Sequence, residues 1–345
     1  MVDDEPPAMT NMKNMKNQQV LLARRPNGWV SEEDFSIVES DLPEPGEGEI
    51  LVENQWLSLD PYMRGRMNDA KSYAKSVALG EVMVGGTVGK VVVSKNPRFA
   101  IGDVVVASLG WQHFGVSDGK GVMKVDASKV PASAYLGAVG MPGVTAWYGL
   151  FEIGAPKPGE TVVVGAAAGA VGSVVGQLAK LRGCRAVGVA GGRDKCEHVV
   201  RDLGFDACVD HRDPALGQAL AEATPNGIDV YFENVGGPLL DLVIKRLNPF
   251  SRIPLCGLVS QYNAKESYGV KGFLALLSNR VKVQGFIVSD HLDVWPRAQK
   301  ELAEWVMEGK IVFRESVAKG LSQAPRAFIG MLKGENLGKQ LVQIA

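Results

Sequence analysis

The sequence predicts an α/β fold with two domains: a doubly wound parallel sheet and a smaller β-rich barrel or sandwich. Three observations predict it. A chain of 345 residues is long enough for about two domains. Its first third carries short Val-, Leu- and Ile-rich runs separated by turns, whereas its middle alternates apolar runs with helical patterns. A glycine-rich turn joins the first apolar run of that alternation to the first helix.

The β-rich part extends from Val20 to about Ser128. Its predicted strands are 19–22, 49–57, 82–93 and 103–108. Proline- and glycine-rich turns such as 43–48 separate them, and this spacing predicts a small barrel or sandwich. Residues 1–17 are polar and lack the apolar core of a signal peptide, so we expect a disordered leader outside the fold.

The alternating part begins near Val139. Its predicted strands are 161–164, 186–190, 207–209, 228–233, 251–256 and 281–286. The first predicted helix follows the glycine-rich turn and ends near Arg182. The other predicted helices span 195–203, 215–223, 238–247, 272–277 and 293–308. This rhythm is typical of a doubly wound dinucleotide fold. After the last helix the sequence returns to short β pieces and turns, so we expect the C-terminus to fold back onto the first domain.

Charge and composition exclude several classes of function. A net charge of −1 provides no global field for nucleic acid or an anionic membrane, and no apolar run approaches the roughly 20 residues of a membrane span. The cysteines are Cys184, Cys196, Cys208 and Cys256. They form no C-x-x-C pair and the four histidines form no H-x-x-x-H pair, so we expect no metal site. Free thiols of this kind are typical of a reducing cytoplasm.

The turn after residues 161–164 predicts a dinucleotide site. It reads Gly165-Ala-Ala167-Ala-Gly169-Ala-Val-Gly172, with alanine at the first position of the G-x-G-x-x-G fingerprint. Gly169 permits close approach of a pyrophosphate, Gly172 lets the helix pack on the sheet, and the helix N-terminus offers free N–H groups. The alternative is a tight turn that binds nothing.

The end of the second strand favours NADP over NAD. An NAD site usually places an acidic side chain there for the ribose 2′-hydroxyl. This chain has Gly191 and Gly192 at that point, with Arg193 and Lys195 close behind, and cations suit a 2′-phosphate. Asp194 is expected to cap the following helix. The alternative is that both cations belong to a solvated helix start.

The catalytic groups are less evident. Because the first domain contains no cysteine, we expect hydride transfer without a metal Lewis acid, which favours an activated C=C bond over a plain carbonyl. Tyr262 follows the fifth strand, where ligands bind in such folds, and Tyr62 lies in the unusual segment 57–67. Either tyrosine could instead be an ordinary surface or interface residue.

With these residues in view, the chain resembles the zinc-free medium-chain dehydrogenase/reductases over nearly all of residues 18–345. It is similar to the group that holds leukotriene B4 hydroxydehydrogenase/prostaglandin reductases and plant double-bond reductases, and most similar to bacterial NADPH-dependent curcumin reductases. The motifs that carry the resemblance are 60–64 (DPYMR), 141–146 (MPGVTA), 167–172, 233–237 (ENVGG), 256–263, 284–287 (QGFI) and 334–339 (GENLGK).

The resemblance implies a Rossmann NADP-binding domain at 141–314 and a GroES-like β-barrel catalytic domain at 18–140 and 315–345. It implies a cofactor site built from Met141, Thr145, Gly169, Ala170, Val171, Gly172, Gly192, Arg193, Lys195, His211, Asn234, Cys256, Gly257, Leu258, Val259, Ser260, Tyr262, Phe286, Ile287, Val288 and Asn336. It places Tyr262 and Tyr62 along the substrate cleft as the catalytic candidates. One residue departs from the prostaglandin-reductase pattern, which has tyrosine where this chain has His211.

The expected activity is NADPH-dependent reduction of the C=C bond of α,β-unsaturated ketones and aldehydes, an oxidoreductase acting on CH–CH groups. The resemblance also implies a cytoplasmic homodimer paired through edge strands near 281–286. Two alternatives stay open. One is 15-oxoprostaglandin 13-reductase or hydroxy-eicosanoid dehydrogenase activity, and the other is a non-catalytic NADPH-binding module.

Overall fold

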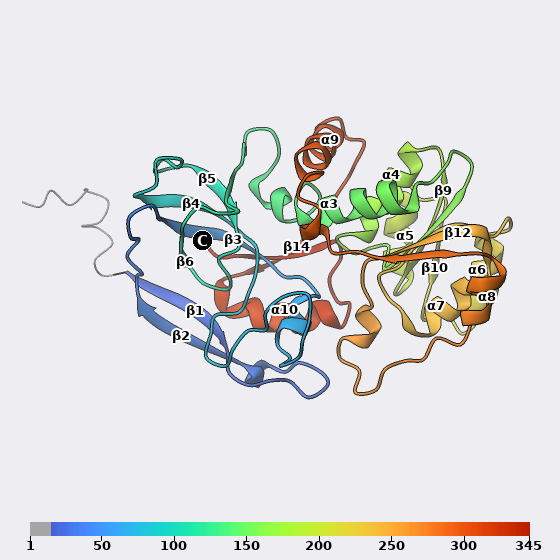
Figure 1. Cartoon of the computed structure of the whole chain (residues 1–345), viewed down its shortest axis with the longest axis horizontal. Coiled ribbons are helices and arrows are strands. Elements are labelled where there is room, and N and C mark those ends of the chain that lie inside the picture. Colours follow the sequence, from blue (N-terminus) through green and yellow to red (C-terminus); the bar gives the residue numbers. More distant parts are fainter. Residues whose placement is uncertain (1–14) are drawn as a thin grey trace, which may run out of the picture. The chain divides into compact units, whose positions relative to one another are not determined.

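The computed structural model describes residues 15–345, which divide into two units. The first unit comprises the chain up to Leu136 together with 317–333 and 340–345, and the second comprises 137–316 with 334–339. One unit is built on antiparallel strands and the other on a parallel αβ sheet, which confirms the predicted fold class (Figure 1). The segment 334–339, assigned from sequence to the first domain, belongs to the second unit.

The main sheet of the first unit has the strand order β14-β15-β3-β4-β5-β7, with β6 paired to β3 beside this path. These strands are β3 (Ile50–Ser58), β4 (Thr87–Ser94), β5 (Val104–Ala107), β6 (Phe114–Ser117), β7 (Met123–Lys124), β14 (Glu315–Lys319) and β15 (Lys339–Gln343). Strands β1 (Lys16–Leu22) and β2 (Phe35–Asp41) form a separate antiparallel pair. The predicted strands of this half are therefore present, and the sequence analysis missed β2, β6 and β7.

The ends of the first unit differ from the sequence predictions. Strand β1 begins at Lys16, inside the predicted leader 1–17. The Asn17 side chain is 1% exposed, and its amide exchanges two hydrogen bonds with the backbone of Phe114. Residues 16 and 17 thus belong to the fold, and the prediction for 1–14 lies outside the described residues. The expectation of only β pieces after residue 308 is wrong, because α10 (Ala324–Leu332) is a helix.

Short helical elements and aromatic packing complete the first unit. The helical elements are η1 (Glu32–Asp34), α2 (Met63–Arg66), η2 (Ala132–Leu136) and η6 (Leu321–Gln323). The fully buried Trp111 ring stacks on Phe35 with ring centroids 5.4 Å apart and meets Phe328 of α10 edge-on at 5.6 Å. An early strand, a middle loop and a late helix thereby share one core, which brings the C-terminal stretch into the first unit as expected.

The second unit contains a parallel sheet with strand order β10-β9-β8-β11-β12-β13. Its strands are β8 (Thr161–Gly165), β9 (Arg185–Ala190), β10 (Ala207–Asp210), β11 (Ile228–Phe232), β12 (Leu247–Leu255) and β13 (Lys282–Gly285). Numbered along the chain, this is the 3-2-1-4-5-6 order of the doubly wound dinucleotide fold. The order reverses between β8 and β11, and ligands of such sheets bind at the carboxyl ends of the strands at this point.

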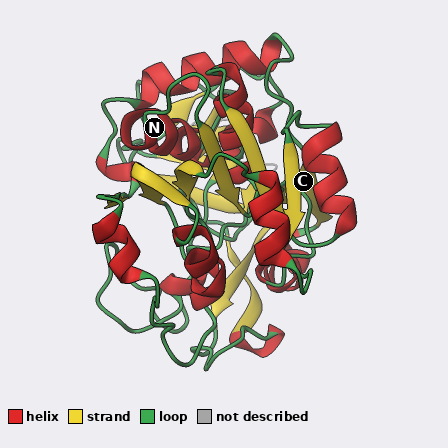
Figure 2. Ribbon diagram, turned by 90° about the vertical axis from the view of Figure 1, so that its right-hand side faces the viewer, coloured by secondary structure: helices red, strands yellow, loops and turns green. Residues whose placement is uncertain are grey.

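Helices cover both faces of the parallel sheet (Figure 2). Val162 and Val164 of β8 pack into one buried cluster with α3 and α4, whereas Val163 packs into another with α6 and α7. Burial on both faces explains why this strand is apolar throughout. The helices are α3 (Met141–Tyr148), its π-helical continuation η3 (Gly149–Gly154), α4 (Gly172–Leu181), α5 (Arg193–Arg201), α6 (Leu216–Ala223), α7 (Gly237–Ile244), η4 (Val259–Gln261), α8 (Phe273–Ser278), η5 (Val288–Asp290) and α9 (Trp295–Met307). Within residues 15–345, none of the helices has the length and apolarity needed to cross a membrane.

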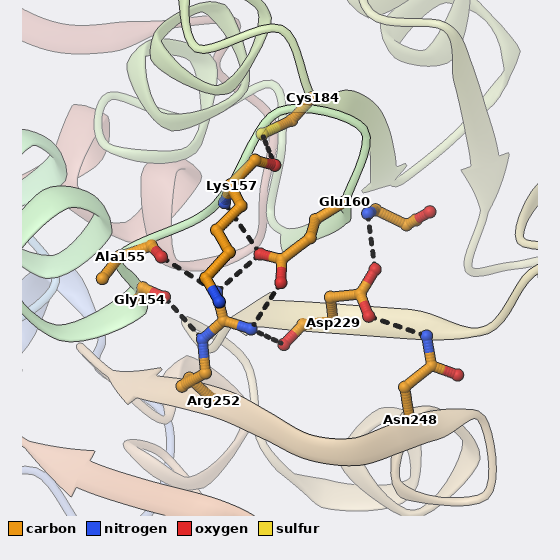
Figure 3. A network of polar contacts seen from close by, with 9 residues as sticks. Gly154, Ala155, Lys157, Glu160, Cys184, Asp229, Asn248 and Arg252 are labelled. Atoms are coloured by element: carbon orange, nitrogen blue, oxygen red, sulfur yellow. Dashed lines mark hydrogen bonds and ion pairs between the residues drawn. The ribbon is translucent and has the colours of Figure 1, made fainter.

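A polar network fixes the amino end of this sheet, opposite the glycine-rich turn (Figure 3). Arg252 of β12 donates to both carboxylate oxygens of Glu160, at 3.1 and 2.6 Å, and to the carbonyl of Gly154 at 2.7 Å. Asp229 of β11 accepts from the backbone N–H of Thr161 at 2.8 Å. Three neighbouring strands are thus tied together at the end remote from the expected ligand.

Candidate functional site

The glycine-rich turn between β8 and α4 has the form that a pyrophosphate requires. A Cβ on Gly172 would lie 2.3 Å from the carbonyl oxygen of Ala166, so only glycine allows this close packing. A Cβ on Gly169 would lie 3.2 Å from the same carbonyl oxygen, a tight contact that also favours glycine. The N-cap residue Val171 makes no side-chain hydrogen bond, so no side chain of this residue caps the start of α4, the end of a helix that attracts anions.

The C-terminal segment 334–339 lies against this turn within the same unit. The N–H of Gly338 donates to the carbonyl of Ala168 at 2.9 Å, and Gly338 forms a parallel bridge with Gly169. The Asn336 side chain donates to the carbonyl of Gly338 at 2.8 Å. The structure therefore brings Asn336 to the glycine-rich turn, although more than 160 residues separate them in the sequence.

Cationic side chains gather around Gly191 and Gly192 at the end of β9. A Cβ added to Gly191 would lie 2.7 Å from Nε2 of His211. A Cβ added to Gly192 would lie 3.2 Å from Nη1 of Arg212. Lys195 is half-buried in the first turn of α5, where burial and the neighbouring Arg212 charge lower its pKa. Two cations held close to each other next to glycines without side chains could hold a dianionic group such as a 2′-phosphate.

The carboxylate nearest to this cluster supports the turn and does not fill the site. Oδ1 of Asp210, at the end of β10, accepts from the N–H groups of Gly192 and Arg212, each at 2.9 Å. These bonds lower the pKa of Asp210. Arg193 turns elsewhere: its guanidinium is 88% exposed and pairs with Glu197 at 2.6 Å. Arg212, which the sequence analysis left without a role, thus occupies the place expected for Arg193.

Glu233 organises the turn after β11 and is a second residue without a role from sequence. It is fully buried, and its Oε1 accepts from the N–H groups of Val235 and Gly236 at 2.6 and 2.9 Å and from the Tyr231 hydroxyl at 3.1 Å. Burial raises the pKa of its carboxyl although these bonds oppose that shift. Asn234 next to it donates to the carbonyl of Gly165 at 2.8 Å, which joins the ends of β11 and β8 at the switch point.

The segment after β12 brings 256–260 and Tyr262 to the same edge of the sheet. The N–H groups of Cys256 and Gly257 donate to the backbone carbonyl of Glu233 at 3.0 and 3.1 Å. The Tyr262 hydroxyl accepts from the N–H of Leu258 at 3.3 Å, and a Cβ on Gly257 would lie 2.9 Å from that hydroxyl. The phenol therefore folds back over the strand end. Burial raises the pKa of the Cys256 thiol to about 12, so it stays protonated.

Met141, Thr145 and the segment 286–288 belong to the second unit as well. The Thr145 hydroxyl is buried in α3 and donates to the carbonyl of Met141 at 2.7 Å. Phe286 and Val288 are buried, and the Phe286 ring packs on Tyr148 with centroids 5.6 Å apart. Ile287 is half-buried between them at the carboxyl end of β13, the last strand of the sheet.

Tyr62 lies in the first unit, directly before α2. It packs against the apolar core of that unit, and the guanidinium of Arg66 stands 5.8 Å from its ring centroid. Burial first, and the Asp60 charge second, raise the pKa of its phenol. The hydroxyl therefore keeps its proton at neutral pH, which a hydrogen-bond donor to a substrate oxygen requires.

The second unit fits a phosphorylated dinucleotide. A glycine-rich turn stands at a helix N-terminus, and a cation cluster stands at the next strand end. Cation recognition could have been extended to Arg212 from the sequence, because the carboxyl ends of adjacent parallel strands share one edge. Among residues 15–345, no group of three or more His, Cys, Asp or Glu side chains is placed to hold a metal ion.

Comparison with known proteins supports this assignment at several levels. A family model described as the N-terminal domain of oxidoreductase matches residues 18–125, and one described as zinc-binding dehydrogenase matches residues 170–305. The chain is 48% identical to an NADPH-dependent curcumin reductase of Escherichia coli, covering 96% of this chain and 98% of that protein. It is 39% identical to an NADP(+)-dependent 2-alkenal reductase of Nicotiana tabacum, covering 96% and 99%.

A solved structure extends the likeness to three dimensions. The crystal structure of CurA in complex with NADPH from Vibrio vulnificus superposes with a TM-score of 0.91 at 48% sequence identity. The match covers 95% of this chain and 99% of that chain. Both units of the fold and the order of their elements therefore have a counterpart in that structure.

Proposed function

Because the chain belongs to the zinc-free medium-chain dehydrogenase/reductases, we propose that it reduces the C=C bond of α,β-unsaturated ketones and aldehydes with NADPH. The observation that carries this function is the 48% identity to the curcumin reductase across 96% of the chain. The cation cluster of Lys195 and Arg212 beside Gly192 supports the choice of NADPH independently, since it suits the 2′-phosphate that distinguishes NADPH from NADH.

Each part of the second unit has a separate task in cofactor binding. The glycine-rich turn 169–172 holds the pyrophosphate, with Asn336 on the C-terminal segment beside it. Lys195, Arg212 and His211 hold the 2′-phosphate, with Arg193 left on the surface. The remaining positions border the ribose and nicotinamide, and these are Met141, Thr145, Asn234, Cys256–Ser260 and Phe286–Val288. NADPH supplies the hydride that is added to the β-carbon of the substrate.

Tyr262 stabilises the substrate oxygen. As the β-carbon accepts hydride, negative charge develops on the carbonyl oxygen, which becomes an enolate. The Tyr262 hydroxyl accepts from the N–H of Leu258, and this bond orients the phenol and strengthens its O–H as a donor to that oxygen. Tyr62, kept protonated by burial, is the second donor candidate. Solvent then protonates the α-carbon of the enolate.

The test is an NADPH-oxidation screen over enals, enones, quinones and curcuminoids, followed by identification of the products. The expected result is a saturated ketone or aldehyde in which deuterium from deuterated NADPH appears at the β-carbon. Reduction of the carbonyl would contradict the proposal. Oxidation of a hydroxy-eicosanoid with NADP⁺, without enone reduction, would favour the eicosanoid alternative. Tight NADPH binding without turnover of any compound would favour a non-catalytic module.

We further propose that the protein is a homodimer formed through β13. This strand is the last in its sheet and is paired only to β12 among the described strands. Nearby on α8, Phe273, Leu274 and Leu277 are between 71% and 75% exposed. An unpaired strand next to exposed apolar side chains invites association with a second copy. Light scattering should give twice the chain mass at micromolar concentration and one chain mass for Leu274→Asp/Leu277→Asp. A wild-type monomer would contradict the proposal.

We propose a cytoplasmic location from the state of the thiols. Cys196 and Cys208 hydrogen-bond to each other as free thiols. Cys184 and Cys256 are free thiols as well. Neighbouring thiols persist in reducing compartments, whereas oxidising ones favour disulfides. Burial raises the pKa of both thiols, so they become reactive only after unfolding. When cells are quenched in acid and the denatured protein is then alkylated, Cys196 and Cys208 should both carry an alkyl group. Recovery of a disulfide between these two cysteines would contradict this location.

A further inference from the structure

The loop after Tyr262 is irregular and mostly solvent-exposed. It runs from residue 263 to Gly272, between η4 and α8, and the orange ribbon of Figure 1 follows it toward α8 beside α7. Asn263 is buried at the start of the loop, residues 264–267 and 269–271 are exposed, and Tyr268 and Gly272 are half-buried. A loop with so few buried side chains needs specific polar contacts to keep one conformation.

Asp241 of α7 supplies these contacts. Its carboxylate is 8% exposed and accepts hydrogen bonds from three groups of the loop. The Tyr268 hydroxyl donates to Oδ2 at 2.7 Å, and the N–H groups of Lys271 and Gly272 donate to Oδ1 at 2.8 and 3.0 Å. The Tyr268 bond lowers the pKa of Asp241, and the two backbone bonds lower it further. One buried carboxylate on a helix therefore holds both the middle and the end of the loop.

Two further contacts restrict the same loop. The N–H of Tyr268 donates to Oε1 of Gln261 at 2.8 Å, and Gln261 directly precedes Tyr262 in the sequence. A Cβ on Gly272 would lie 2.9 Å from Cγ2 of Ile244, so the end of the loop packs closely on α7. Tyr268 in the middle of the loop is thus tied to the residue that directly precedes Tyr262, the proposed hydrogen-bond donor of the reaction.

We propose that Asp241 is a positioning residue that sets the size selectivity of the enone site by holding the loop 263–272. The inference rests on the proposed function. Loops that follow the carboxyl ends of parallel strands border the ligand in this fold, so the conformation of this loop limits the room beside Tyr262. Asp241 acts through Tyr268, Lys271 and Gly272 and needs no contact with substrate or cofactor.

The experiment compares Asp241→Ala, Asp241→Asn and Tyr268→Phe with the wild type. The control is Asp206→Asn, because Asp206 also accepts a backbone N–H, from Ala186 at 2.7 Å, but precedes β10 at the opposite end of the sheet. Hydrogen exchange of residues 263–272 is measured together with kcat/KM for a small aliphatic enone and for a long diaryl enone. The dissociation constant of NADPH is the third readout.

In Asp241→Ala, exchange of the loop amides should be about tenfold faster, and the kcat/KM ratio of the long to the small enone should rise by a similar factor. Asp241→Asn should restore most of both properties, since its amide oxygen still accepts the two N–H groups. Tyr268→Phe should give an exchange rate and a kcat/KM ratio between those of Asp241→Ala and Asp241→Asn. NADPH affinity should change by less than about threefold, because the phosphate contacts are elsewhere.

Several outcomes overturn the inference. If the two enones lose kcat/KM in parallel in Asp241→Ala, or if Asp206→Asn shifts the ratio equally, Asp241 is a general stability residue. If Asp241→Ala does not fold, an unchanged ratio in Tyr268→Phe has the same meaning. Failure of the proposed function is distinct from these results, since it would appear as absence of enone turnover in the wild type.

Discussion

Replacing Lys195 by alanine should weaken NADPH binding selectively. The Lys195 ammonium donates to the carbonyl of Gly334 at 2.7 Å, which leaves two of its three N–H groups for a phosphate. Its pKa is lowered by burial and by Arg212, so the charge lies in an unfavourable environment until an anion arrives. One charge-assisted hydrogen bond contributes about 1.5–3 kcal/mol. Its loss should raise the dissociation constant of NADPH by about 10- to 150-fold.

NADH separates this effect from a structural one. Lys195 also joins α5 to the segment 334–339, so its removal loosens the pyrophosphate region to some extent for both cofactors. NADH lacks the 2′-phosphate, and its dissociation constant should therefore rise by only about threefold. Titration of the nicotinamide fluorescence on binding measures both constants. Arg193→Ala is the matched control, because its guanidinium is exposed and paired with Glu197, and we expect little change in either constant.

Equal losses for NADPH and NADH in Lys195→Ala would refute the reasoning. That result would mean that Lys195 serves only to hold Gly334. A large NADPH-specific loss in Arg193→Ala would also refute the reasoning, because it would mean that the 2′-phosphate binds at Arg193 rather than at Lys195.

Three further results are expected. Tyr262→Phe should lower kcat for an enone by about tenfold or more with little change in NADPH affinity, and a loss confined to KM would make Tyr262 a wall of the pocket. Gly176→Ala should destabilise the fold by about 1–3 kcal/mol in urea denaturation, because its Cβ would lie 1.8 Å from the Phe205 ring. For Glu160, burial is the largest single effect and would raise the pKa, but the Arg252 hydrogen bonds, the Lys157 N–H bond and both cationic charges together outweigh it. The pKa is therefore lowered, and the stabilising contribution of Glu160 is lost as pH falls. Glu160→Gln should therefore flatten the decline in unfolding free energy below about pH 4.3, and an unchanged decline would refute this.

Regular elements of the parallel sheet were predictable because each carries a strong local pattern. Strand β8 is an uninterrupted apolar run that is buried on both faces, and a glycine-rich turn marks its end. In contrast, β2 alternates buried or half-buried residues with exposed ones such as Ile37 and Glu39, so its apolar signal is weak. Helix α10 was missed because Pro325 and Gly330 look like helix breakers, yet proline in the first helical turn is compatible with a helix.

Side-chain direction was the part of the site that local sequence did not determine. Arg193 and Lys195 both follow Gly192 closely, but a helix turns them toward different surroundings: Arg193 reaches Glu197 in solvent and Lys195 reaches Gly334. Arg212 lies in the turn after β10, so its place beside Gly192 is predictable only once β9 and β10 are recognised as neighbouring strands. Contacts made across strands depend on the register of the sheet, which a linear motif does not contain.

The bridge between Gly169 and Gly338 affects how this protein becomes competent during synthesis. The chain passes from one unit to the other at 136/137, 316/317, 333/334 and 339/340. The wall of the pyrophosphate turn is therefore encoded more than 160 residues after the turn itself. A nascent chain that has already completed the parallel sheet still lacks that wall until residues 334–339 have been synthesised. Cofactor capture is thus coupled to synthesis of this late segment, and a chain truncated before residue 334 would lose its nucleotide affinity while retaining most of the domain that provides it.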